Sequence, residues 1–206
     1  MTSARPLLVA GAAAGPLFVA AFLVDGATRP GYDPRRHPVS SLALGPRGWR
    51  QRANFAVAGA LYLTGAVGLG WARGRAAVQP VLVGAAAVGL LSAGAFRTDP
   101  VSGYPPGTPA VTDPRTTTGV VHDLSAIPVF FGIPAAAFVE ARRTGDRGWA
   151  RASAGSGAGM LAFLFLSSAG FAQRPAFVGR AGLLQRASII CGFGWLTALM
   201  LRALRR

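Results

Sequence analysis

Residues 6–24, PLLVAGAAAGPLFVAAFLV, form a continuous apolar run without a single charge. A helix that crosses a bilayer needs about 17–25 mostly apolar residues, and this run has that length. Because the run does not alternate apolar and polar positions, a helix is favoured over a membrane β-strand. Its length, Pro16 and the lack of a small-x-small cleavage site before Asp25 favour a retained first span over a cleaved signal peptide.

Five further apolar runs follow, separated by charged or proline-rich stretches. They cover residues 54–72, 80–96, 119–139, 152–172 and 183–201. The last run is long enough only if Arg186 faces protein or reaches the membrane surface. The sequence therefore predicts an all-α integral membrane bundle of six transmembrane helices, with residues 1–206 forming a single domain.

The composition supports a membrane protein. Of the 206 residues, 51% are hydrophobic and 14% are charged, whereas soluble chains carry about 25% charged residues. All 21 basic residues are arginine, and the net charge is +14. The arginines flank the apolar runs and are not interleaved with aromatics, so lipid headgroups are favoured over nucleic acid as the anionic partner. Arginine without lysine, with 28 Gly and 15 Pro, is typical of a GC-rich bacterial genome.

The arginines also predict an orientation. An even number of spans places both termini on one side, with ten arginines concentrated near the termini and in short loops. The other eleven are spread through longer loops that also hold most of the acids. Because the positive-inside rule gives most weight to dense, short loops, we expect both termini in the cytoplasm and the protein in the bacterial cytoplasmic membrane.

The polar residues gather on the opposite, outer side. In the first outer loop, Val39–Leu44 predicts a helical turn at headgroup level, followed by Trp49, Arg50 and Arg52. The second, residues 97–114, is proline-rich and predicts a rigid, non-helical course. Together with the adjacent helix ends, these loops supply the candidate proton-transfer residues Asp25, Asp33, His37, Asp99 and His122. The candidate ligand-binding residues are Arg97, Tyr104, Asp123 and Arg186.

Three interpretations of this group remain open. Imidazole and carboxylate side chains together transfer protons near neutral pH, and Arg97 or Arg186 is suited to clamping an anion. Alternatively, the aspartates form structural ion pairs, such as Asp99 with Arg97 or Arg186. A metal or ligand site without chemistry is the third interpretation. The histidine spacing matches no metal motif, and the sequence predicts no cofactor.

The outer-loop residues carry a family resemblance. The shared features are Gly31-Tyr32-Asp33, His37-Pro38-Val39-Ser40-Ser41-Leu42, Trp49, Asn54-Phe55, Thr98-Asp99-Pro100, Pro105-Pro106-Gly107-Thr108-Pro109, His122-Asp123 and Trp149. In this combination the chain resembles a bacterial multi-pass membrane-protein family, domain of unknown function 998. The resemblance implies a multi-helix membrane fold over nearly the whole chain, and it brings no reaction, substrate or cofactor.

We expect acid–base chemistry on a lipid or isoprenoid-like substrate at the outer face. The alternative is a non-enzymatic membrane protein that binds a lipid or a partner, with the outer cluster as an ion-pair lock. A small transporter is a further alternative, although no ionisable residue is predicted at mid-span. Glycine pairs at Gly11/Gly15 and Gly155/Gly159 predict close helix packing, within one chain or in a homo-oligomer.

Overall fold

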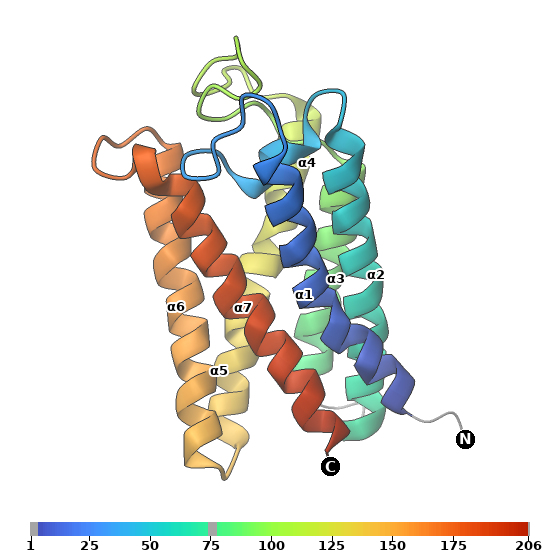
Figure 1. Ribbon diagram of the computed structural model, residues 1–206. Helices are drawn as coiled ribbons and strands as arrows, with labels where there is room; N and C mark the ends of the chain where they lie inside the picture. The colour runs from blue at the N-terminus through green and yellow to red at the C-terminus, as the bar shows by residue number, and fades with distance from the viewer. Residues whose placement is uncertain (1–3, 74–77, 206) are drawn as a thin grey trace.

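The computed structural model describes residues 4–73 and 78–205, whose regular elements are helices (Figure 1). In chain order they are α1 (Ala4–Ala27), η1 (Val39–Ala43), α2 (Gly48–Arg73), α3 (Val78–Ala95), α4 (Thr117–Ile127), η2 (Pro128–Gly132), α5 (Ile133–Arg143), α6 (Arg147–Phe171), η3 (Val178–Arg180) and α7 (Ala181–Leu204). Six helical stretches among these residues are long and apolar enough to cross a membrane. The prediction of an all-helical, multi-pass membrane protein is therefore confirmed.

The fourth span differs in detail from the predicted uninterrupted helix. Its path over Thr117–Arg143 runs through α4, η2 and α5, and η2 is a stretch of π-helix. Pro128 and Pro134 lie at the start of η2 and just after it, and neither has an N–H to donate to the preceding turn. The regular helical hydrogen bonding is thus broken at both ends of the π-helical stretch.

Close packing at glycine holds α1 against α2. A Cβ atom added to Gly11 would lie 2.7 Å from the Cα of Gly65, so any larger residue would push the two helices apart. The predicted close approach at Gly11 is confirmed and occurs within the chain. At Gly155 an added Cβ would meet nothing within 4 Å, so this glycine makes no such contact inside the chain.

The two ends of the bundle differ in character (Figure 1). One end, here the terminal end, holds the start of α1, the end of α7 and the short turn between α5 and α6. The opposite end, here the loop end, holds the segments 28–47, 96–116 and 172–177. Both termini therefore lie at one end, as an even number of spans requires. The side of the membrane that each end faces remains a prediction, and Arg75 and Arg206 of that argument lie outside the described residues.

The first loop at this end contains the predicted helical turn, a 3-10 helix over Val39–Ala43. Gly45 follows it with a φ of +72°, a left-handed conformation that favours glycine. Trp49, Arg50 and Arg52 lie in the first turns of α2, which begins earlier than the apolar pattern indicates. The second loop has no regular helix between α3 and α4, in agreement with its proline content.

Candidate functional site

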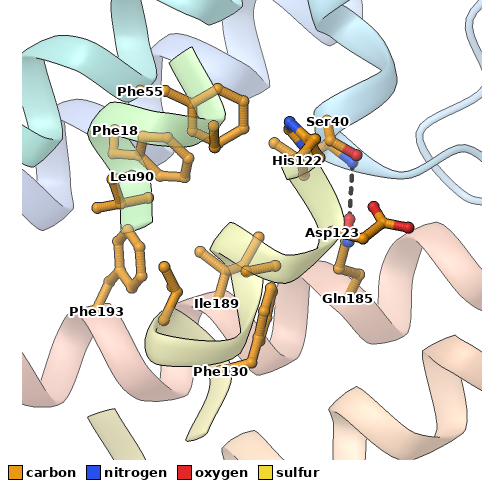
Figure 2. Close-up of a pocket in the computed structure, with 14 residues that line it drawn as sticks. Phe18, Ser40, Phe55, Leu90, His122, Asp123, Phe130, Gln185, Ile189 and Phe193 are labelled. Carbon is orange, nitrogen blue, oxygen red and sulfur yellow. Dashed lines mark hydrogen bonds between the residues drawn. The ribbon is translucent and has the colours of Figure 1, made fainter. Parts of the chain in front are cut away.

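A cavity of about 120 Å³ lies beneath the loop end, between helices from both halves of the chain. Its apolar wall comes from α1, α2, α3, η2 and α7 and includes Phe18, Phe55, Leu90, Val129, Phe130, Ile189 and Phe193. Its polar rim is formed by Ser40, His122, Asp123 and Gln185, which Figure 2 shows on one side of the cavity. The cavity is thus amphipathic, with its polar groups nearest to the loops.

His122 is the buried ionisable group of this rim. It lies in the second turn of α4, and its residue is only 5% exposed. The Nδ1 atom is 2.9 Å from the Phe96 carbonyl oxygen, and because a carbonyl only accepts, Nδ1 carries the hydrogen. In the neutral ring Nε2 then holds the lone pair. No hydrogen bond to Nε2 is found within the described part of the chain.

Two other rim side chains, Ser40 and Gln185, come from η1 and α7. Gln185 accepts a hydrogen bond through Oε1 from the backbone N–H of Val39, at 2.7 Å (Figure 2). This bond holds η1, and with it Ser40, over the start of α7. Because Oε1 is used in this way, the amide NH₂ of Gln185 is the part left to donate to a ligand.

Asp123 lies at the mouth of the cavity and is exposed. Its carboxylate forms an ion pair with Arg115, whose Nε is also 4.0 Å from the Asp99 carboxylate. One guanidinium is therefore shared between the carboxylate at the mouth and the carboxylate of Asp99.

Asp99 is part of the structure that begins α4. Its carboxylate accepts hydrogen bonds from the Thr116 backbone N–H at 3.1 Å and from the Thr116 hydroxyl at 2.6 Å. The same hydroxyl oxygen accepts from the Gly119 N–H and so caps the helix. A Cβ on Gly119 would lie 2.1 Å from a carboxylate oxygen of Asp99, so glycine is needed for this approach. Asp99 thus stabilises the helix that carries His122.

Asp25 forms a second, separate group at the end of α1. Arg29 donates a hydrogen bond to its carboxylate at 2.6 Å, and both side chains are buried. The same guanidinium donates to the carbonyls of Leu42 and Leu44, which flank the end of η1. The pair therefore ties the first loop to α1 and does not line the cavity.

Arg186 anchors the same loop from α7. Its buried guanidinium donates to the Pro34 carbonyl at 2.7 Å, to the His37 carbonyl at 3.2 Å and to the Tyr32 hydroxyl at 2.6 Å. The central carbon of the guanidinium, Cζ, also lies 5.6 Å from the centre of the Phe22 ring. All of these partners are neutral, so the cation is stabilised by dipoles and aromatic rings and not by a carboxylate.

His37 is enclosed in an aromatic cluster within this loop. Its Nδ1 accepts a hydrogen bond from the Asp33 backbone N–H at 2.8 Å, and its ring packs 5.5 Å from Tyr32 and 5.2 Å from Tyr104. Burial lowers the pKa of His37, and the nearby Asp33 carboxylate opposes that shift in part. The ring is therefore neutral at physiological pH. Burial likewise raises the pKa of Tyr32, with Arg186 opposing.

The nine candidate residues do not converge on one cavity. His122 and Asp123 line it, whereas Asp99 caps α4, Asp25 pairs with Arg29, and Arg97 is exposed on the surface. The remaining four, Asp33, His37, Tyr104 and Arg186, build the first loop and its contact with the second. Within residues 4–73 and 78–205, no group of three or more His, Cys, Asp or Glu side chains is placed to hold a metal ion.

Sequence reasoning missed a polar network at the terminal end. Glu140 is buried in α5 and accepts from Arg73 at 2.5 Å, from Gln79 at 3.2 Å and from the Trp149 indole N–H at 2.8 Å. The signal was present as a glutamate just after the fourth apolar run. Ser40 and Gln185 were also missed as cavity residues, because their packing against η1 and α7 is not visible in the sequence.

The model of a family described as "Protein of unknown function (DUF998)" matches residues 12–202. The chain belongs to this family. The match includes every residue of the cavity and confirms the resemblance drawn from the loop motifs. No curated protein and no solved structure matches the chain.

Proposed function

We propose that this DUF998 protein binds a lipid- or isoprenoid-like molecule in the cavity, with the polar head of the ligand held by His122. The observation that carries the proposal is the position of Nε2. It belongs to a buried imidazole on the rim of an apolar cavity, and its hydrogen-bonding capacity is not used within the described residues. Because His122 lines the cavity, a donor group on a bound ligand would supply this nitrogen with a hydrogen-bond partner.

The surroundings of the cavity support entry from the bilayer. Helices α4 and α7, which the structure describes in full, both line the cavity, and no Cα atom of one lies within 8 Å of a Cα atom of the other. The lining residues Ala126 and Phe130 are partly exposed at this gap. Ile127 and Ile190, on the outer surfaces of the same two spans, are about half exposed and suited to lipid. A membrane-dissolved ligand therefore has a lateral route to His122.

A second candidate function, acid–base chemistry on that ligand, is favoured by the hydrogen bond from Nδ1 to the Phe96 carbonyl. This bond orients the ring and leaves the lone pair on Nε2, the arrangement that a general base requires. His122 would then take a proton from the ligand head. Asp99, a candidate acid, is hydrogen-bonded to Thr116, so the chemistry would rest on His122.

Cavity filling tests the binding proposal. We expect Ala126→Phe to occupy the space beside His122, while Ala20→Phe on the exposed face of α1 leaves the cavity open. The proteins would be purified in a mild detergent and their bound lipids identified by mass spectrometry. A lipid retained by the wild type and by Ala20→Phe, and lost from Ala126→Phe, is the expected result. Equal lipid content in all three folded proteins would contradict the proposal.

A lipid comparison between a deletion strain and its parent separates binding from chemistry. If His122 performs proton transfer, the deletion strain should differ from its parent in a substrate and a product lipid, and His122→Gln should fail to restore the parental profile. If the site only binds, a variant that retains the lipid should complement. His37→Gln serves as the control, because His37 lies outside the cavity.

We further propose that the loop end faces the outside and the termini lie in the cytoplasm. In a Cys191→Ser background, a cysteine at Thr108 should react with an impermeant thiol reagent in intact cells, and one at Gly145 should not. The reverse labelling pattern would invert the orientation and place the cavity at the cytoplasmic surface.

A further inference from the structure

We infer that the head of the ligand is an uncharged hydroxyl, as in a long-chain alcohol, and neither a phosphate nor an ammonium group. The inference rests on the proposed function and adds the chemical class of the ligand. It follows from the hydrogen-bonding groups of the cavity rim, the charges around its mouth and its volume.

The rim offers one acceptor and one donor from two different helices on the polar side of the cavity. His122 supplies the acceptor, Nε2, from α4, and Gln185 supplies the donor, its amide NH₂, from α7. A hydroxyl group donates one hydrogen and accepts another, so it satisfies both. A phosphate dianion only accepts and would oppose the lone pair of Nε2. An ammonium group only donates and would oppose the NH₂ group of Gln185.

No cation on the rim would balance a phosphate. None of the residues that line the cavity within the described chain is an arginine. Both arginines of the predicted anion clamp are elsewhere, because Arg97 is exposed and Arg186 is buried beneath Tyr32. Anionic phosphates are normally held by such guanidinium groups. At the mouth, Arg115 is already paired with Asp123 and lies near Asp99, so its charge is not available to an anion.

A cationic head is disfavoured by the wider charge distribution. The loop end as a whole carries eleven arginines against five aspartates, so the field there is positive beyond the mouth. Asp123, the carboxylate that lines the cavity, is already paired with Arg115. A charge of either sign would therefore be buried among aromatic and aliphatic side chains without a dedicated partner, which is costly.

The volume restricts the size of the head. The cavity holds about 120 Å³, somewhat less than the roughly 150 Å³ of an engineered cavity that admits benzene. It therefore has room for a hydroxyl and the first few carbons of one chain. The remainder of the chain would leave through the gap between α4 and α7 into the bilayer. A head enlarged by a sugar or a phosphate ester would not fit without rearrangement.

The test compares three amphiphiles with one tail. A tritiated C15 prenyl alcohol, its monophosphate and the matching primary amine would be titrated against the full-length protein in detergent. We expect the alcohol to bind at least tenfold more tightly than either charged analogue. We also expect His122→Gln to weaken binding of the alcohol at least tenfold, while His37→Gln, whose side chain is outside the cavity, leaves it within twofold per folded protein.

Gln185→Glu provides a specificity switch with little change of shape. The new side chain keeps an oxygen for the Val39 N–H and replaces the NH₂ donor by an acceptor with a negative charge. Affinity for the alcohol should fall and affinity for the amine should rise. Damage to the fold would instead lower the affinity for both ligands.

The outcomes separate the two proposals. Binding of the phosphate or the amine at least as tightly as the alcohol, abolished by Ala126→Phe, would overturn the hydroxyl assignment and leave the lipid-binding cavity in place. Failure of all three to bind the wild type, with no difference from Ala126→Phe, would contradict the cavity as a lipid site.

Discussion

The terminal end and the loop end of the bundle both bury ionisable side chains, and they use them differently. At the terminal end Glu140 is surrounded by donors from Arg73, Gln79 and Trp149, which join the ends of four helices. At the loop end the carboxylates of Asp25 and Asp99 accept hydrogen bonds from Arg29 and Thr116, whereas His122 has one nitrogen bound to protein and lines a cavity.

This difference shows how to separate structure from function among buried charges. When a buried carboxylate accepts hydrogen bonds from side chains of neighbouring helices, as Glu140 does, a structural role is sufficient to account for its burial. The imidazole of His122 differs, because it lines a cavity and no hydrogen bond to its second nitrogen is found within the described residues. In this protein, an unused hydrogen-bonding atom on a residue that lines a cavity therefore identifies the site better than the number of His and Asp residues.

The largest effect should come from breaking the network at the terminal end. Glu140→Leu leaves the Arg73 guanidinium without its carboxylate, and breaking a buried pair costs about 3–5 kcal/mol. We expect a strongly lowered melting temperature in detergent. The double variant Arg73→Leu/Glu140→Leu should recover part of the loss. A single variant as stable as the wild type would mean that the two ends do not differ as described.

At the loop end, the next largest effect is expected from Arg186→Met. This variant removes the charge-assisted hydrogen bonds to Pro34, His37 and Tyr32, and because it also removes a buried cation, the net loss of stability is smaller than the sum of those bonds. Trypsin cleavage after the exposed Arg36 should accelerate by about tenfold or more, as followed by mass spectrometry. Arg97→Met, on the exposed surface, is the control and should not change the rate. Unchanged cleavage in both variants would show that Arg186 does not anchor the loop.

Protonation of His37 should weaken the loop end in mild acid. Burial lowers the pKa of His37 in the folded protein below its ordinary value near 6.5, so below that pH the unfolded chain binds more protons. Stability is therefore retained above pH 6.5 and decreases as the pH falls toward the folded-state pKa. The melting temperature should fall between pH 7 and pH 5.5, with a shallower slope in His37→Asn than in His122→Gln. Identical slopes in the two variants would exclude His37 as the titrating group.

The smallest effect is expected at the cap of α4. Asp99→Asn keeps the shape of the side chain and weakens its bonds to Thr116, at a cost of about 1 kcal/mol. The melting temperature should fall slightly while the cavity keeps its lipid, as measured by mass spectrometry. Loss of the lipid from a folded Asp99→Asn protein would show that Asp99 contributes to ligand binding. The carboxylates of the loop end would then not be purely structural, as Glu140 is at the terminal end.

The candidate site was predictable only in part. His122 and Asp123 were identified because ionisable residues at the start of a membrane span are conspicuous in the sequence. Their separation from Asp25 and His37 was not predictable, since all of these residues belong to one end of the bundle. Which groups meet depends on Arg29 and Arg186 folding the first loop against α1 and α7, a long-range arrangement with no local pattern.

The sequence by itself determined that the chain is a multi-pass helical membrane protein with its polar groups concentrated at one end. Apolar run lengths and charge positions are sufficient for this, because the hydrocarbon core imposes helix length and excludes unpaired charge. Only the tertiary structure decided which polar groups are saturated and which face a cavity. That depends on the loops between the spans, where hydrogen bonds such as those from Arg186 to Pro34 and from Val39 to Gln185 join residues more than a hundred positions apart.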